Sequence, residues 1–238
     1  MNKAVIIGAT SGIGKELARV FSANGYEVGI AGRRTNLLEE LSSELSTKTY
    51  ISTIDVKNTE FAIQSLEELL KEMQDVDILI INAGIAHTNP SLDWSEEKET
   101  IDTNVSGFTA IAGAAMRYFI KRGAGHLAGI SSIAGIRGGD KAPAYSASKA
   151  FMSNYLEGLS RKAVKEKLPI TITDIQPGFV KTAMVKGDNL FWIASPRKAA
   201  KQIYNAIKRK KGKVYITKRW VLIAWLFKIM PGYFYKRL

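Results

Sequence analysis

Residues 3–14 read KAVIIGATSGIG, an apolar run followed at once by a loop that contains three glycines. The run has the length of a buried strand, and helically spaced apolar residues follow the loop until Asn24-Gly25, a helix stop signal. A glycine loop between a strand and a helix suits a dinucleotide, because free N–H groups and the helix dipole attract its pyrophosphate. The alternative is a tight turn that binds nothing.

Strands and helices continue to alternate along most of the chain. Further strands are predicted at 26–31, 49–54, 76–81, 127–130, 170–175 and 214–217, with helices at 36–45, 58–73, 94–121 and 195–208 and another that Pro143 opens. This pattern predicts an α/β fold, a single doubly wound, Rossmann-type domain with a mainly parallel seven-stranded sheet and helices on both faces. We expect residues 1–217 to form a dinucleotide-binding catalytic domain and residues 218–238 to form a tail that is not an independent domain.

The composition excludes several classes of site. The 238 residues include no cysteine, so disulfides, thiolate metal sites and cysteine nucleophiles are excluded, which fits a reducing compartment. His87 and His126 are the only histidines, so a histidine-rich metal site is excluded and no metal is expected. We expect a cytoplasmic protein, because a strand-length run rather than a signal peptide follows Met1 and no stretch has the length of a membrane span.

The charge is concentrated near the end of the chain. There are 34 basic and 22 acidic residues, a net charge of +12, and residues 197–238 hold 13 basic residues with no Asp or Glu. The apolar segment from Trp220 to Met230 is too short to span a bilayer, but it can lie at the interface with its flanking cations on anionic lipid. We therefore expect peripheral contact with the inner face of an anionic membrane; packing on the core or at a subunit interface is the alternative. Nucleic acid is not expected, because aromatic-interleaved basic strands are missing.

Residues suited to chemistry follow the predicted strands. Because the carboxyl ends of parallel strands meet at one edge of a sheet, we expect one shared site from Gly8 to Gly14, Arg33, Asp55, Asn82-Ala83-Gly84, Ser132 and Pro177-Gly178. Tyr145 and Lys149 are four residues apart, so on a helix they leave the same face. A nearby ammonium lowers the pKa of a tyrosine and suits it to proton donation. The alternative is that Tyr145 and Lys149 simply lie on a solvated helix face.

Together these residues resemble the short-chain dehydrogenase/reductase family over about residues 3–217. The matching motifs are Gly8/Gly12/Gly14, Asp55, Asn82-Ala83-Gly84, Asn104, Ser132, Tyr145-x-x-x-Lys149 and Pro177-Gly178-x-x-x-Thr182. The 13-residue spacing between Ser132 and Tyr145 is the one expected in the family, which selects Ser132 over Ser131. The resemblance implies hydride transfer between a nicotinamide cofactor and a carbonyl/alcohol pair.

The resemblance also implies roles for four catalytic residues. Tyr145 would donate a proton to the developing alkoxide, and Lys149 would lower the Tyr145 pKa and bind the nicotinamide ribose. Ser132 would hydrogen-bond the substrate oxygen, and Asn104 would hold a water that connects Lys149 to solvent. The implied cofactor contacts are Gly8, Thr10, Ser11, Gly12, Ile13, Gly14, Arg33, Asp55, Val56, Asn82, Ala83, Gly84, Tyr145, Lys149, Pro177, Gly178, Val180 and Thr182.

Two features bear on the choice of cofactor and substrate. Gly32 stands where NAD-preferring members carry an acidic residue, and Arg33 follows it, so the resemblance implies NADP(H) in preference to NAD(H). The short segment between Thr182 and Ser195 contains Met184, Val185, Leu190, Phe191, Trp192 and Ile193. This apolar flap favours a lipophilic substrate such as a steroid, a retinoid, or a 3-ketosphinganine-like or other lipid ketone; packing of a loop onto the core is the alternative.

The resemblance leaves other functions open. A 3-oxoacyl reductase or a general soluble carbonyl reductase would carry the same motifs, and a catalytically silent NADP-binding regulatory protein belongs to another class. The tail is similar to the C-terminal extension of membrane-associated members. A homodimer or homotetramer is expected from the family.

Overall fold

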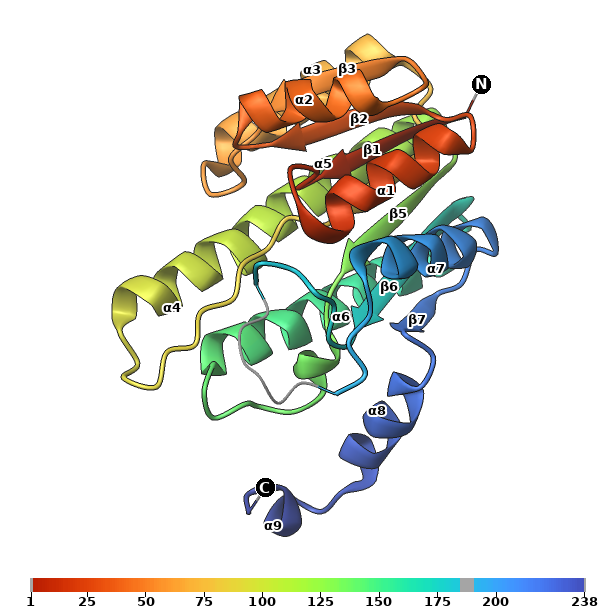
Figure 1. Ribbon diagram of the computed structural model, residues 1–238. Helices are drawn as coiled ribbons and strands as arrows, with labels where there is room; N and C mark the ends of the chain where they lie inside the picture. Colours follow the sequence, from red (N-terminus) through yellow and green to blue (C-terminus); the bar gives the residue numbers. More distant parts are fainter. Residues whose placement is uncertain (1, 185–190, 238) are drawn as a thin grey trace.

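Seven parallel strands form one sheet at the centre of the molecule, in the order β3-β2-β1-β4-β5-β6-β7 (Figure 1). The structure is a computed structural model that describes residues 2–184 and 191–237. The strands are β1 (Lys3–Ile7), β2 (Glu27–Gly32), β3 (Thr49–Thr53), β4 (Ile78–Ile81), β5 (Gly125–Ile130), β6 (Ile170–Pro177) and β7 (Lys213–Ile216). Each predicted strand is present with ends within two residues of those expected. The predicted doubly wound α/β fold is confirmed.

The strand order creates the crevice in which the site lies. β1 pairs with β2 on one side and with β4 on the other. The connections that leave the carboxyl ends of β1 and β4 therefore run in opposite directions, and ligands of open α/β sheets bind at such a switch point. Both strands are apolar along nearly their whole length and buried on both faces, as a parallel sheet covered by helices requires.

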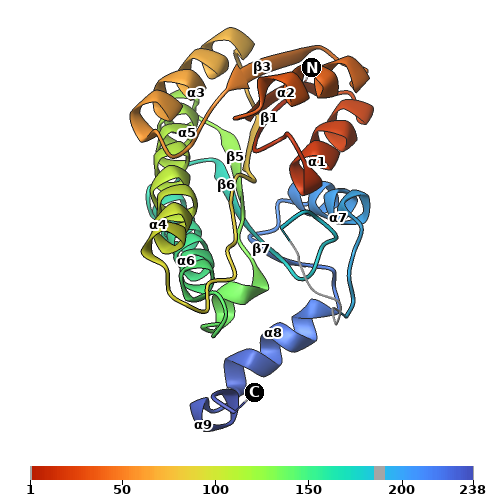
Figure 2. The same cartoon turned by 60° about the vertical axis from the view of Figure 1, so that its left-hand side comes forward.

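Helices cover both faces of the sheet (Figure 2). On one face lie α1 (Gly12–Ala23), α2 (Thr35–Glu44) and α7 (Pro196–Lys208). On the other lie α3 (Thr59–Met73), α4 (Trp94–Ile101), α5 (Phe108–Arg122) and α6 (Pro143–Lys165). Each layer buries its own apolar core against the sheet, with Phe21 at the centre of the first and Phe108 and Phe119 in the second. The burial of the apolar side chains of both cores is the main driving force that holds the layers together.

The long helix predicted at 94–121 is observed as three consecutive segments. A π-helical stretch, η1 (Asp102–Gly107), joins α4 to α5, and the backbone keeps right-handed helical angles throughout. Gly107 ends this stretch close to Val56, which lies shortly after β3, and a Cβ at Gly107 would lie 2.6 Å from the Val56 carbonyl oxygen. The close approach thus requires glycine at this position. A π-turn inside an α-helix often marks a functional site, and this one carries Asn104.

The chain after β7 forms two further helices, α8 (Trp220–Ile229) and α9 (Gly232–Tyr235). Both views show them projecting beyond the carboxyl-end edge of the sheet (Figures 1 and 2). Trp220 and Ala224 are buried, whereas Leu222 and Trp225 are exposed, so α8 packs on the body with one face only. Among the described residues, none of the helices combines the length and apolar character needed to cross a bilayer.

Candidate active site

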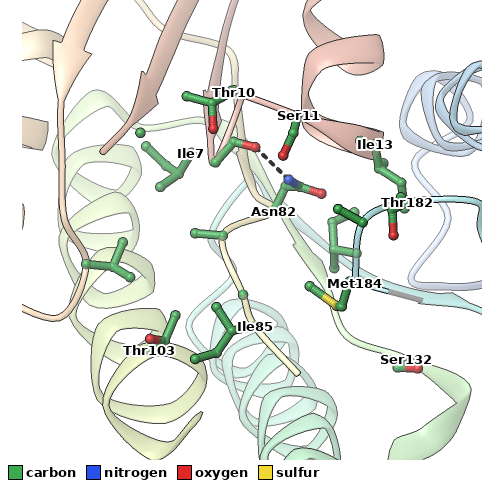
Figure 3. Close-up of a pocket in the computed structure, with 18 of the residues that line it drawn as sticks. Ile7, Thr10, Ser11, Ile13, Asn82, Ile85, Thr103, Ser132, Thr182 and Met184 are labelled. Carbon is green, nitrogen blue, oxygen red and sulfur yellow. Dashed lines mark hydrogen bonds between the residues drawn. The ribbon is translucent and has the colours of Figure 1, made fainter. Parts of the chain in front are cut away.

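A cavity of about 300 Å³ opens at the carboxyl ends of β1, β2, β4, β5 and β6 (Figure 3). Its walls include every residue predicted to contact the cofactor except Gly14. They also include Ser132, Tyr145 and Lys149, but not Asn104. The structure therefore brings together residues that lie as far apart in the sequence as Gly8 and Gly178, as the common strand edge predicted.

The glycine loop after β1 has two positions that need glycine for conformational reasons. Gly8 and Gly12 have φ angles of +89° and +56°, in the left-handed region. Gly14 differs, because its importance is steric: a Cβ there would lie 2.1 Å from the Gly8 carbonyl oxygen. Gly14 thus lets α1 pack closely against the loop and lies behind the cavity wall, so the direct cofactor contact expected of it stays a prediction.

Two arginines lie at the end of β2, on the cavity wall. The Arg34 guanidinium donates hydrogen bonds to Thr10 Oγ1 over 2.6 Å and to Ser11 Oγ over 3.2 Å. Arg33 also lines the cavity, and neither arginine forms an ion pair within the part of the chain that the structure describes. The sequence pointed to Arg33 as the cofactor contact and did not indicate that Arg34 bonds to the glycine loop. Two adjacent arginines do not by themselves show which guanidinium contacts that loop.

Asn82 ties the end of β4 to the glycine loop. Its Nδ2 donates to the Gly8 carbonyl oxygen over 2.7 Å (Figure 3). The N–H groups of Asn82 and Ala83 both donate to the Ile7 carbonyl oxygen. The Asn82-Ala83-Gly84 turn therefore holds neighbouring strand ends in register at the cavity floor. Asp55 is held on the rim by a hydrogen bond from the Lys57 N–H to its Oδ1 over 3.1 Å.

Lys149 is buried beside Tyr145 on α6. Its ammonium donates to the Ile130 carbonyl oxygen over 3.0 Å and lies 5.7 Å from the centre of the Tyr145 ring. Burial lowers the pKa of Lys149 to about 8, and the negative charge of Asp174 opposes this shift. Burial raises the pKa of Tyr145, and a hydrogen bond with Ser132 partly offsets it. Burial thus sets the net direction of the Tyr145 pKa, which is raised, and the lowering expected from Lys149 stays a prediction.

Asn104 is fully buried one layer behind the cavity. Its Oδ1 accepts from the Ile85 N–H over 2.9 Å, and its Nδ2 donates to the Ile85 carbonyl oxygen over 2.8 Å and to Ser148 Oγ over 3.0 Å. These bonds join the π-helical stretch to the segment after β4 and to α6. A Cβ at Gly84 would lie 3.2 Å from Asn104 Oδ1 and 3.3 Å from Lys149 Nζ, so Gly84 leaves the space between these two polar groups open.

Sequence reasoning missed several wall residues besides Arg34. They are Ile7, Gly32, Ile54, Ile85, Thr103, Ile130, Ser131 and Ala183. Most follow or end a strand, so the shared-edge argument could have included them. Thr103 of η1 lies in the cavity wall (Figure 3), and its buried hydroxyl has no hydrogen-bond partner within the described part of the protein. No pattern in the sequence distinguishes this threonine from others on helices.

Comparison with known proteins assigns the family. The family described as short chain dehydrogenase matches residues 2–191. The chain belongs to the short-chain dehydrogenase/reductase family. Membership in this family makes the protein an oxidoreductase.

Three similar proteins illustrate the relationship. Dehydrogenase/reductase SDR family member 7B of Danio rerio is 35% identical over 231 residues, which cover 87% of this chain and 74% of that protein. The NADP-dependent 3-hydroxy acid dehydrogenase YdfG of Shigella flexneri is 34% identical over 185 residues, which cover 74% of this chain and 71% of that protein. The solved structure of ElxO with NADP bound superimposes with a TM-score of 0.80, at 22% identity, over 90% of this chain and 96% of that one. At that identity the structural likeness supports the fold alone.

In this short-chain dehydrogenase/reductase an aromatic cluster joins the flap to the tail. The cluster comprises Phe179, Phe191, Trp192 and Trp220; the Trp220 ring lies 5.1 Å from that of Phe191 and 5.3 Å from that of Phe179, measured between ring centres. A Cβ at Gly178 would lie 2.1 Å from the Trp220 ring, so this glycine makes room for the tail. Val185 and Leu190 of the predicted flap lie outside the described residues.

The tail is also bonded to the loop that precedes Tyr145. Arg137 follows the short 3₁₀ helix η2 (Ile133–Ile136), and its guanidinium donates to the carbonyl oxygens of Phe227 and Met230 at the end of α8. The Tyr235 hydroxyl donates to the Gly138 carbonyl oxygen over 2.8 Å. The tail therefore packs on the rest of the protein with one side and leaves its other side exposed.

Proposed function

We propose that this protein transfers a hydride between NADP(H) and a carbonyl/alcohol pair. The observation that carries the proposal is the position of Ser132, Tyr145 and Lys149 in the wall of the cavity that the Gly8–Gly12 loop opens. The left-handed glycines leave the loop backbone free of side chains toward the cavity, and the adjoining N-terminus of α1 suits a pyrophosphate. The backbone N–H groups of the loop and of the first turn of α1 are therefore suited to hold the pyrophosphate of a dinucleotide.

The chain's own groups would each contribute one part of the chemistry. The nicotinamide cofactor would supply the hydride chemistry. The Ser132 hydroxyl would donate to the substrate oxygen, and Tyr145 would donate the proton that this oxygen takes up during reduction. Lys149 would stabilise the negative charge that the phenol leaves behind. Asn104 would keep the Ile85 segment and α6 at a fixed separation, and the water-holding role expected for it remains part of the proposal.

We assign NADP(H) rather than NAD(H) as the preferred cofactor. The end of β2 offers Arg33 and Arg34 and carries glycine where a carboxylate would face the ribose. The relative from Shigella flexneri is named as NADP-dependent, which agrees with this assignment. Asp55, Val56 and the Asn82-Ala83-Gly84 turn would surround the adenine side, and Pro177, Gly178, Val180 and Thr182 the nicotinamide side.

Substitution of each arginine tests the cofactor assignment. Arg33→Ala and Arg34→Ala should each lower kcat/KM for NADPH by about 10- to 100-fold, because a hydrogen bond to a charged group contributes about 1.5–3 kcal/mol. The value for NADH serves as the internal control and should stay within about twofold of wild type. Equal losses with both cofactors would contradict the assignment.

For the substrate we propose a lipophilic carbonyl compound. Met184, Phe191, Trp192 and Ile193 are all exposed in the described part of the flap, and Met184 lines the cavity. A panel of steroids, lipid ketones, 3-oxoacyl thioesters and short ketones, each assayed with NADPH and with NADH, tests the proposal. Turnover of short ketones or 3-oxoacyl thioesters in preference to lipid ketones would favour the general carbonyl reductase or 3-oxoacyl reductase alternatives. Cofactor binding without any turnover would favour the catalytically silent regulatory protein.

An anionic membrane surface is the proposed partner of the tail. Leu222 is 67% and Trp225 62% exposed on the outward face of α8, and Arg219 and Lys228 flank them. Apolar side chains ringed by cations suit the headgroup region of anionic bilayers. The double substitution of Leu222 and Trp225 by Glu should abolish co-sedimentation with phosphatidylserine vesicles, whereas Val164→Glu, an exposed position at the end of α6, should not.

Sedimentation velocity without lipid tests the proposed homodimer or homotetramer. DNA retention that exceeds vesicle binding would contradict the proposed membrane partner and the expectation that the protein binds no nucleic acid.

A further inference from the structure

One buried hydroxyl in the cavity wall has no partner in the protein itself. Five buried polar side-chain atoms lack a hydrogen-bond partner in the described part of the chain, and of the residues that carry them only Thr103 lines the cavity. Thr103 is 6% exposed, so its hydroxyl is largely withdrawn from bulk water. An unsatisfied buried polar group costs free energy, and a ligand that hydrogen-bonds it removes that cost. The hydroxyl therefore marks a place in the wall where a polar ligand atom would be stabilised.

The helix does not satisfy this hydroxyl as it satisfies that of a neighbouring threonine. Thr100 lies near the end of α4, and its Oγ1 donates to the Glu96 carbonyl oxygen over 2.9 Å. Threonines inside helices often make this bond to the carbonyl oxygen four residues before them. Thr103 lies at the start of η1, where the helix changes to π geometry, and its Oγ1 makes no such bond. This hydroxyl is thus available to a ligand.

Thr103 lies on the side of the cavity assigned above to the adenine end of the cofactor. Gly107, four residues further along η1, approaches Val56 so closely that a Cβ there would lie 2.6 Å from the Val56 carbonyl oxygen. The residue after Thr103 is Asn104, which bonds the Ile85 backbone. The stretch η1 therefore places Thr103 between the residues that follow β3 and those that follow β4. Figure 3 shows it on the same side of the pocket as Ile85.

The wall around Thr103 suits a purine base. Ile54, Val56 and Ile85 line the cavity there and offer apolar surface to the flat faces of a ring. A threonine hydroxyl can both donate and accept hydrogen bonds. Adenine carries ring-nitrogen acceptors and an amino donor along its edge, so either arrangement would satisfy the hydroxyl.

We propose that the Thr103 hydroxyl is a further cofactor-binding group, which hydrogen-bonds the adenine of the dinucleotide. The inference rests on the proposed function, since it requires that NADP(H) occupies the cavity. Because the hydroxyl has no partner in the described part of the protein, its hydrogen bond forms only with the ligand. Thr103 should therefore contribute to cofactor affinity without contributing to the stability of the protein alone.

The test compares wild type with Thr103→Val, which replaces the hydroxyl by a methyl group of similar size. The dissociation constants for NADPH and for adenosine 2′,5′-bisphosphate, measured by isothermal titration calorimetry, should both rise by about 3- to 10-fold, as expected for the loss of one neutral hydrogen bond. Adenosine 2′,5′-bisphosphate lacks the nicotinamide half, so an equal factor for both probes would assign the hydroxyl to the adenosine half. The midpoint of urea unfolding without ligand should not fall, because no hydrogen bond within the protein is removed.

Thr109→Val is the matched control. The Thr109 hydroxyl is likewise buried without a partner among the described residues, but Thr109 lies on α5 and does not line the cavity. Its removal should leave both dissociation constants within about twofold of wild type. Thr103→Ser keeps the hydroxyl and should bind both probes within about threefold of wild type.

Several results would overturn the inference. Unchanged dissociation constants in Thr103→Val, or a rise for NADPH alone, would show that the hydroxyl does not bind the adenine. A lower urea midpoint in Thr103→Val than in Thr109→Val would show that the hydroxyl stabilises the protein itself. Failure of the wild type to bind either probe would refute the proposed function and the inference with it, whereas tight binding that Thr103→Val leaves unchanged would refute the inference alone.

Discussion

The Tyr145 phenol lies where its protonated form is favoured. Burial raises its pKa, and the hydrogen bond with Ser132 only partly compensates. In the proposed reduction, a phenol that remains protonated at neutral pH would donate to the alkoxide as it forms, and the Lys149 ammonium, 5.7 Å from the centre of the Tyr145 ring, would then stabilise the phenolate. The raised pKa therefore means that Tyr145, the proposed general acid, would begin the reaction protonated rather than partly ionised.

Removal of the phenol oxygen should separate chemistry from binding. Tyr145→Phe should lower kcat for ketone reduction by about 10²- to 10⁴-fold, because it removes the general acid while leaving the ring in place. The dissociation constant for NADPH, measured by fluorescence, should stay within about threefold. Tyr155→Phe offers the control, since Tyr155 stacks on Phe151 on the same helix and does not line the cavity. Comparable activity in Tyr145→Phe and Tyr155→Phe would refute the catalytic role.

Glycine substitutions distinguish close packing from helix propensity. A Cβ at Gly14 would overlap the Gly8 carbonyl oxygen at 2.1 Å, so Gly14→Ala should lower the free energy of unfolding by about 2 kcal/mol or more and displace the loop. Gly158, inside α6, has open space around its Cβ position, and Gly158→Ala should stabilise the protein by about 0.5–1 kcal/mol. Urea unfolding of both variants gives the comparison. Equal effects would show that the 2.1 Å approach does not constrain position 14.

At the scale of the element, α8 has two different faces. Trp220 and Ala224 face the body, and the opposite side carries exposed leucine and tryptophan. The buried Trp220 ring lies over Gly178, in the turn proposed to hold the nicotinamide side of the cofactor. The tail is therefore continuous with the site, although its outer face remains uncovered.

The two tryptophans of α8 should behave differently. Trp220→Ala should lower the free energy of unfolding by roughly 3 kcal/mol or more, because it empties a packed aromatic site, and it should also weaken NADPH binding through the Gly178 turn. Trp225→Ala should change the free energy of unfolding by less than about 0.5 kcal/mol, since that side chain is 62% exposed. Urea denaturation and NADPH titration check both. The same loss of stability in both variants would mean that α8 does not pack as described.

For the molecule as a whole, His126 links stability to pH. It lies at 6% exposure on β5, and its Nε2 is 2.7 Å from Thr173 Oγ1, which itself donates to the Lys211 carbonyl oxygen. Because the Thr173 hydroxyl hydrogen is used for the Lys211 carbonyl oxygen, the imidazole donates to Thr173 through Nε2. Burial, with a smaller repulsion from Lys210, lowers the pKa of His126 from 6.5 to about 4. Protonation would place an uncompensated cation between two strands.

The sign of the pH dependence is set by that lowered pKa. Below pH 6.5 the unfolded chain takes up a proton on His126 that the folded protein refuses, so stability is full above this value and is lost as the pH falls toward about 4. The contribution amounts to roughly 3 kcal/mol at most. His126→Gln, which keeps a donor for Thr173, should lose less stability than wild type between about pH 7.5 and about pH 4.5 in urea unfolding. His87→Gln is the control, and a slope for His126→Gln equal to that of wild type would refute the assignment.

The strand-and-helix order and the position of the site are determined by local patterns along the chain. Short apolar runs such as Ala4–Ile7 and Ile78–Ile81, each followed by a glycine-containing turn, favour buried strands, and the parallel arrangement places the residues after each strand on one edge of the sheet. For that reason Gly8 and Ser132 could be assigned to one site from the predicted strand ends, and the family resemblance adds Tyr145 and Lys149; all four line one cavity. Their chemistry depends on residue types and spacings, which the sequence states directly.

Other features depend on contacts between distant segments and could be seen only in three dimensions. Three such contacts join residues that no local pattern relates. They are the hydrogen bond from Arg34 to Thr10, the hydrogen bonds between Asn104 and Ile85, and the packing of the Trp220 ring against Gly178. The direction of the Tyr145 pKa also belongs here, because its largest cause is burial, a property of the assembled fold. Local periodicity decides which elements form, whereas packing decides which side chains meet and how strongly each is removed from water.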